Sequence, residues 1–316
     1  MPSRTVSQKT FFLIALLTLI LAGLACSLLP SQITEPPTAV STSAVDLPAD
    51  EPTADSPPEE MPATISPTAA APSETAPIEG LVTADFDSVT FSFGLDVANQ
   101  WKVEFIPQGP GRSSSAGPFP YTDPEHLIFS LENYALPETC CNPLNQPQII
   151  VYPVVQMSEQ NPVATTQITA LQTYLASPPA NLMDQFVEIP FLPLFNAAQT
   201  FHTQVRFVDF QNGKGVRYLT QYSQGPMPVN NASIFYTFQG ITNDGSYYVA
   251  VTMPVTHPSL KNNAEEVFDL EGDAFMTDPI NYINGVTQAL DSLDPGTFTP
   301  GLDALDAMIQ SLMIRP

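Results

Sequence analysis

The sequence predicts an α+β fold: a mainly antiparallel sheet with two long hairpins, flanked by helices as in an α/β/α sandwich. Three observations predict it. Strand-like segments dominate the chain from Gly80 onward, short Asn- and Gly-containing turns join two pairs of them, and apolar residues near the carboxyl end recur at helical spacing. Residues 80–316 also hold 17 of the 19 Phe, all 10 Tyr and the only Trp. We therefore expect a single globular domain over this range.

The first part of this domain alternates or clusters β-forming residues in four segments. They are Val89–Leu95, Trp101–Ile106, His126–Tyr134 and Gln148–Val155. A helix is expected next, over Val163–Leu175, because its apolar residues fall on one helical face and the pair Pro178-Pro179 stops it.

Two hairpins follow. The first is expected to turn at Asn212-Gly213, which would pair Phe207 with Tyr218 and Thr203 with Tyr222 and place Arg206 and Arg217 on the opposite face. The second is expected to turn at 243–245. Its strands are almost continuously apolar, which favours a central position covered on both faces.

Two helices are expected to close the chain. Asp278-Pro279 has the pattern of an N-cap followed by proline at the first helical position, and Thr299-Pro300 repeats it. Apolar residues recur at helical spacing after each signal. The acidic segment before Asp278 is expected to be a solvated loop.

The amino terminus has the features of an export signal. Arg4 and Lys9 precede the apolar run Phe11–Ala22, and small residues lead to Cys26. The segment LAGLACSLL resembles the lipobox of bacterial lipoproteins, although Gly23 stands where that motif usually has Leu. The resemblance implies a signal peptide over 1–25 and a Cys26 carrying acyl chains such as palmitate. An uncleaved membrane anchor and a cleaved, secreted protein are the alternatives.

Residues 27–79 hold 11 prolines and 9 carboxylates and no Lys, Arg, His or aromatic residue. Such a composition cannot bury enough apolar surface to fold, so we expect 26–79 to be a lipidated cysteine and a disordered stalk. The expected location is the cell membrane or outer membrane surface, outside the cytoplasm, with the membrane as a partner through the lipid.

Without residues 1–25 the chain has 7 basic and 32 acidic residues, a net charge of −25. This charge repels nucleic acid, so nucleic acid is excluded as a partner. An envelope protein or a small ligand is the partner class that remains.

Two resemblances add to this description. The element order over about 89–293 is similar to the α/β/α sandwich of the photosystem II extrinsic subunits and their bacterial relatives. The phrases LPLFNAAQTF, GVRYLTQY and DGSYYVAVTMPV resemble an uncharacterised family of exported bacterial proteins. Neither resemblance implies an activity or a cofactor.

Cys140 and Cys141 are adjacent, and an exported protein rarely keeps two free thiols. They are candidates for a vicinal disulfide. Pairing between molecules and two reduced thiols are the alternatives.

A candidate ligand face gathers on the first hairpin: Arg206, Arg217, Tyr222 and His202. These arginines could bind an anion, although pairing with acids across the sheet is the more usual role. Asp269, Glu271 and Asp273 form a weak Ca²⁺ candidate that matches no EF-hand loop. The run Ile189–Phe195, broken by two prolines, is expected to be a buried loop rather than an exposed apolar patch.

No catalytic or cofactor motif stands out in the sequence. We therefore expect a membrane-tethered, non-enzymatic binding or assembly module that needs no cofactor. The alternatives are a small-molecule or glycan receptor and an extracytoplasmic hydrolase with His202 as general base.

Overall fold

A computed structural model describes residues 80–110, 121–136, 140, 146–194 and 196–315. The predicted signal peptide, Cys26, the predicted stalk and Cys141 lie outside these residues. The chain divides into two units, Met1–Ala71 and Pro72–Pro316, and every described residue belongs to the second. In this part of the chain, no helix is long and apolar enough to cross a membrane.

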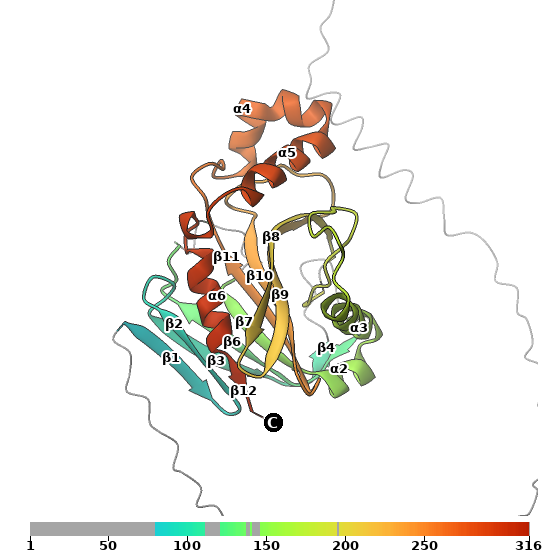
Figure 1. The fold of residues 1–316 in the computed structure, drawn as a ribbon, viewed down its shortest axis with the longest axis vertical. Coiled ribbons are helices and arrows are strands. Elements are labelled where there is room, and N and C mark those ends of the chain that lie inside the picture. The colour runs from blue at the N-terminus through green and yellow to red at the C-terminus, as the bar shows by residue number, and fades with distance from the viewer. Residues whose placement is uncertain (1–79, 111–120, 137–139, 141–145, 195, 316) are drawn as a thin grey trace, which may run out of the picture. The chain divides into compact units, whose positions relative to one another are not determined.

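The centre of the domain is a seven-stranded sheet in which every pair of neighbours is antiparallel (Figure 1). Its order is β3 (Gln100–Ile106), β6 (His126–Glu132), β7 (Gln148–Pro153), β11 (Tyr247–Pro254), β10 (Phe235–Thr242), β9 (Gly213–Ser223) and β8 (Ala198–Phe210). The predicted α+β class is confirmed.

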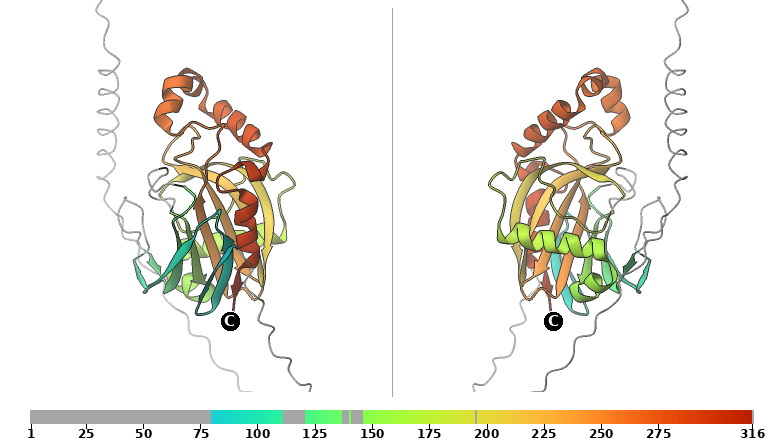
Figure 2. Two further views of the ribbon diagram at one scale, coloured as in Figure 1. Left: turned by 90° about the vertical axis from the view of Figure 1, so that its left-hand side faces the viewer. Right: turned by 90° about the vertical axis from the view of Figure 1, so that its right-hand side faces the viewer.

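Helices cover both faces of this sheet. α2 (Val154–Gln160) and α3 (Pro162–Ala176) lie on one face, and Figure 2 shows α3 crossing it. The other face carries α6 (Leu302–Ser311) and a small sheet of β1 (Leu81–Phe86), β2 (Val89–Gly94) and β12 (Met313–Ile314). β4 (Gly109–Pro110) and β5 (Thr122–Asp123) pair with each other as a short antiparallel ribbon.

The two faces bury separate cores, and strand alternation explains the division. On β10, Tyr236 and Phe238 belong to the core under α6, whereas Phe235 and Ile241 belong to the core under α3. All eight residues of β10 are buried. The prediction that the second hairpin is central and covered on both faces is therefore confirmed.

The register of the first hairpin differs from the prediction. The turn is Gln211-Asn212, so Phe207 lies opposite Val216 and Thr203 opposite Leu219. Gly213 begins β9 instead of completing the turn, and the position has no room for a side chain, since a Cβ there would lie 2.0 Å from the Phe210 ring. Between Arg206 and the turn the register changes by two residues, which keeps each side chain on its face, so Arg206 and Arg217 stay together and lie directly opposite each other. An irregularity between Thr203 and Arg206 changes the register again, so that Thr203 is displaced by three residues from its predicted partner.

Near the carboxyl end, α5 (Pro279–Asp291) begins as predicted, and the Asp278 carboxylate accepts from the Asn281 N–H at 3.1 Å. The acidic segment before it is not a loop but the helix α4 (Ala264–Thr277), because Asn263 caps it by accepting from Glu266 N–H at 2.9 Å. The second predicted start is also wrong. Thr299 pairs with Thr256 in an isolated bridge, a 3₁₀ turn (Pro295–Thr297) precedes it, and α6 begins only at Leu302.

Candidate functional site

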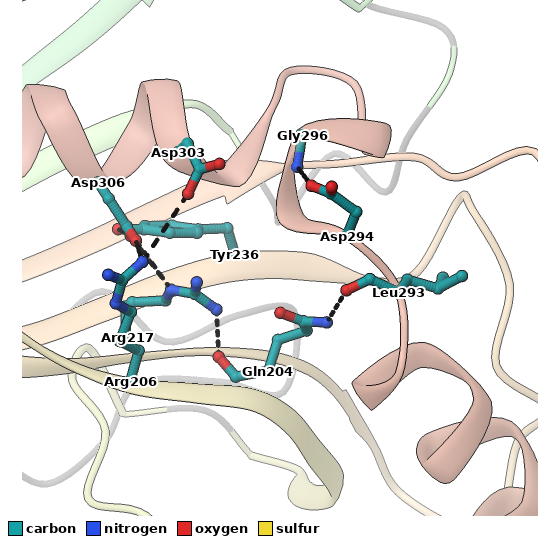
Figure 3. A network of polar contacts seen from close by, with 9 residues as sticks. All are labelled: Gln204, Arg206, Arg217, Tyr236, Leu293, Asp294, Gly296, Asp303 and Asp306. Carbon is teal, nitrogen blue, oxygen red and sulfur yellow. Dashed lines mark hydrogen bonds and ion pairs between the residues drawn. The ribbon is translucent and has the colours of Figure 1, made fainter.

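Arg206 and Arg217 converge on one carboxylate, Asp306 of α6 (Figure 3). Arg217 Nε donates to Asp306 Oδ1 at 3.1 Å, and Arg206 Nη1 lies 3.4 Å from Oδ2. The Tyr236 hydroxyl donates to the same Oδ1 at 3.1 Å. Burial raises the pKa of the Asp306 carboxyl, and the Arg217 charge offsets this only in part.

The two arginines differ in what they can reach. The side chain of Arg217 is 2% exposed and that of Arg206 is 57% exposed. Arg217 also donates from Nη1 to the Gln204 carbonyl, so its role is to join β8, β9, β10 and α6. Arg206, which also lies 3.8 Å from Asp303, is the one of the pair that an anion in solvent could meet.

Gln204 is a structural residue that the sequence did not single out. It sits at an irregularity in the β8–β9 pairing with a φ of +53°. Its Nε2 donates to the carbonyls of Leu290 at 2.8 Å and Leu293 at 2.9 Å, and its N–H donates to Asp291 Oδ1 at 3.0 Å. This one residue thereby satisfies carbonyls at the end of α5, which fixes that helix against β8.

His202 is buried, and burial lowers its pKa. Its Nε2 lies 3.0 Å from the Leu182 carbonyl, and its backbone exchanges two 2.9 Å hydrogen bonds with the Gln185 side chain. A neutral ring that donates to Leu182 satisfies this geometry. Thr220, not Ser223, lies opposite His202. His202 therefore secures the 182–185 segment to β8.

Tyr222 belongs to the core under α3, where its ring lies 4.8 Å from that of Phe191. Gln199 Nε2 donates to its hydroxyl at 3.3 Å, and burial raises its pKa. The structure thus places Tyr222 and the Arg217–Asp306 pair on opposite faces of the sheet. The four residues of the candidate ligand face do not share one surface.

Ile189–Leu192 are buried, which confirms the predicted buried loop for these four residues, while Pro193 and Leu194 are half-buried and Phe195 lies outside the described residues. Glutamine side chains bind its backbone. Gln239 accepts from Leu192 N–H at 2.9 Å and donates to the Leu192 carbonyl at 3.1 Å, and Gln167 accepts from Phe191 N–H at 3.1 Å. The loop uses these amides in place of a neighbouring strand.

A serine–histidine contact lies elsewhere, in the segment after β11. His257 Nδ1 is 2.7 Å from Ser259 Oγ, and the Ser259 N–H donates to the same nitrogen at 3.1 Å. Nε2 lies 3.1 Å from Thr297 Oγ1. Because the Nδ1 lone pair already accepts a backbone N–H two residues on, this arrangement shapes a turn. The sequence singled out only His202, although Ser259 follows His257 by two residues.

Cys140 is disulfide-bonded. The chain's other cysteines, Cys26 and Cys141, lie outside the described residues, so the vicinal pairing stays a prediction.

The Ca²⁺ candidates Asp269, Glu271 and Asp273 lie on α4, where alternate residues point to different sides of the helix. Glu271 pairs with Lys261 at 3.6 Å and accepts from the Tyr282 hydroxyl at 2.5 Å. Nowhere in the described ranges do three or more His, Cys, Asp or Glu side chains form a group suited to a metal ion.

An open groove of about 730 Å³ lies where the start of β8, the loop after β9 and the first turn of α5 meet. Asn196, Ala197, Ala198, Thr200, Ser223, Gln224, Gly225, Pro226, Pro279, Ile280 and Ile283 line it. None of these side chains is charged. The lining therefore combines apolar residues, such as Ile280, Ile283 and the two prolines, with neutral polar side chains.

Hydrogen bonds connect the polar segments that line the groove. Thr200 Oγ1 donates to the Gln221 carbonyl at 3.0 Å, and Gln224 Nε2 donates to the Asn196 carbonyl at 3.2 Å. Gln221 is not itself in the lining, and its Oε1 is buried and accepts no hydrogen bond from the described residues. A buried acceptor of this kind usually has a partner, such as water or a ligand.

No protein-family model matches the chain, and no curated protein is significantly similar to it. Its function must therefore be argued from the arrangement of its own residues.

Proposed function

We propose that this chain is a membrane-tethered, extracytoplasmic, non-enzymatic binding module, and that the groove between β8 and α5 is its binding site. The observation that carries this proposal is a neutral groove in an acidic domain. Residues 80–316 contain 23 acidic and 7 basic residues, yet no charged side chain lines the groove. Its volume of about 730 Å³ is in the range of small-molecule sites.

The lining supports an uncharged ligand that carries both polar and apolar groups. Ile280 and the prolines offer apolar contact, while Asn196, Thr200 and Gln224 offer neutral hydrogen-bonding groups. A charged ligand would lose hydration without gaining an opposite charge in the lining. Uncharged peptides and glycans are the classes that fit this description.

The hydrolase alternative needs His202 within hydrogen-bonding distance of a serine or a carboxylate in a pocket. The position of His202 against the Leu182 carbonyl does not support that role. The binding proposal instead uses the solvent-accessible groove between β8 and α5.

The test is ligand-observed saturation-transfer NMR on the full chain, with N-acetyl amino-acid amides and methyl glycosides as uncharged probes. Ala198 is an exposed groove residue, and Ala198→Trp fills the groove. Ala176→Trp, at an exposed position at the end of α3, is the matched control. We expect transfer to at least one probe in the parent and the control and its loss in Ala198→Trp. Transfer that survives groove filling would refute the proposed site.

A further inference from the structure

The helical hairpin α4–α5 lies at one end of the domain, where α5 packs against β8 and α4 is the outer of the two helices (Figures 1 and 2). α4 packs mainly on α5 and buries only Val267 and Phe275. The Phe275 ring meets Phe268 at 5.6 Å and Tyr282 at 5.5 Å, both edge to face. Most of the surface of α4 therefore faces solvent.

Large apolar side chains are exposed on this hairpin. Leu270 is 69% exposed and Met276 66% exposed on α4, and Ile280 in the first turn of α5 is 71% exposed. Single exposed apolar residues are ordinary, but their concentration between positions 268 and 280 is typical of a surface that meets a partner.

The later charges of α4 are unfavourable for the helix itself. The helix carries no basic residue, and although Glu265 and Glu266 in its first turn favour the helix dipole, Asp269 and Asp273 come after that turn. Asp269 and Asp273 are four residues apart on the exposed side, where like charges repel, and neither carboxylate has an ion-pair partner in the described part of the chain. A carboxylate towards the carboxyl end of a helix also opposes its dipole, and Gly272 lowers the stability of the helix further.

Helical spacing places Asp269, Asp273 and Met276 in one row, with Leu270 beside it. Local choices that reduce stability without a structural gain are expected at functional surfaces. Opposite charges brought by a partner would relieve the repulsion in this row, while its apolar groups would cover Met276 and Leu270.

We infer that this outer face of α4, formed by Asp269, Leu270, Asp273 and Met276, docks a protein partner through a basic amphipathic segment. Charge complementarity selects this occupant. An anionic membrane and a second copy of this acidic chain would both be repelled. All four residues of this face are on α4, and none of them lines the groove.

The probe is a fluorescently labelled, amidated helical Leu/Lys peptide with its leucines on one face. A peptide of the same composition with scrambled order is the comparison. Fluorescence anisotropy with the full chain gives the Kd of each. We expect the amphipathic peptide to bind at least about tenfold more tightly than the scrambled one, because only the former presents charge and apolar surface together.

Two double variants test the face, and a third is the control for charge. We expect Asp269→Asn/Asp273→Asn and Leu270→Gln/Met276→Gln each to raise the Kd about fivefold or more. Glu125→Gln/Asp209→Asn removes two exposed charges elsewhere and should change it less than about twofold. The charge variant should not lower the unfolding midpoint, because it removes a repulsion, so weaker binding would not come from misfolding.

Three results would overturn the inference. Equal weakening by the control variant would show general attraction to an acidic protein. Equal binding of the scrambled peptide would show that α4 does not recognise the apolar face of the amphipathic peptide. Binding to phosphatidylglycerol vesicles, or self-association in sedimentation, that is lost in Leu270→Gln/Met276→Gln would assign the face to lipid or to a second copy.

Discussion

Arg217 on β9 and Asp306 on α6 form a buried ion pair, with Nε 3.1 Å from Oδ1, across 89 residues of sequence. Both side chains are almost fully buried. The Tyr236 hydroxyl and the Gln204 carbonyl complete the hydrogen bonds around the pair. The terminal helix is thus joined to three strands of the sheet through one carboxylate.

Removing that carboxylate should destabilise the domain strongly. We expect Asp306→Ala to lower the free energy of unfolding by about 3–5 kcal/mol, because it leaves the Arg217 charge buried and uncompensated. Arg206→Gln, which changes the exposed partner of the same carboxylate, should cost at most about 1 kcal/mol. Urea unfolding of the full chain measures both. Similar losses for the two variants would contradict the structural role of the buried pair.

The domain should lose stability as the pH falls through the histidine range. Burial lowers the pKa of His202 in the folded state, whereas an unfolded chain titrates near about 6.5. Between these two pKa values the unfolded chain binds more protons than the folded one. The stability that the neutral His202 contributes is therefore complete above about pH 6.5 and is lost as the pH falls through the lowered pKa of the folded state.

The measurement is the urea midpoint of the parent and of His202→Gln at pH 7.5 and 5.5. The variant should lose less stability on acidification than the parent. Asp306 works in the opposite direction, because its raised pKa makes the folded state bind more protons. An acid-induced loss of equal size in parent and variant would show that His202 does not carry this effect.

The fold class could be predicted because its signals are local. The apolar pattern of β10 and β11 and the Asp278-Pro279 helix start lie within short windows of sequence. The register of the first hairpin was beyond such windows, because it depends on distant contacts of the turn. Gly213 lies against the Ile241 carbonyl, and the Asn212 amide donates to the Ile314 carbonyl at 2.5 Å.

The sites were harder to predict for the same reason. The pairing of the arginines with acids was anticipated as a class, but their partner, Asp306, is on a helix whose start was misplaced. The groove joins three segments that are distant in sequence, and its lining carries no charge or motif. The segment of α4 was predicted to be a loop because its many acidic residues are typical of a solvated loop, and the helix cap at Asn263 was not recognised.

The position of the buried loop Ile189–Leu192, on the α3 side of the sheet, should depend on Gln239. This side chain is fully buried, bonds both backbone groups of Leu192 and accepts from the Tyr248 hydroxyl at 2.7 Å. We expect Gln239→Leu to cost about 2–4 kcal/mol, because it leaves buried partners unsatisfied. The control, Gln288→Leu at an exposed position of α5, should stay within about 0.5 kcal/mol. Thermal and urea unfolding of the full chain decide between these expectations.

The proposed tether rests on Cys26. If this cysteine is acylated, the chain expressed in a bacterium with an alkyne analogue of palmitate should carry the label and remain in the membrane fraction, because two or more acyl chains anchor a protein stably. Cys26→Ser should lose the label, while Cys140→Ser, a change at a disulfide-bonded cysteine of the domain, should keep it.

A parent chain that stays in the membrane without label, with residues 1–25 still present by mass, would instead establish the uncleaved anchor. An unlabelled chain released into the medium would establish secretion, and either result would remove the lipid from the proposed function while leaving the groove and the α4 face to be tested on their own.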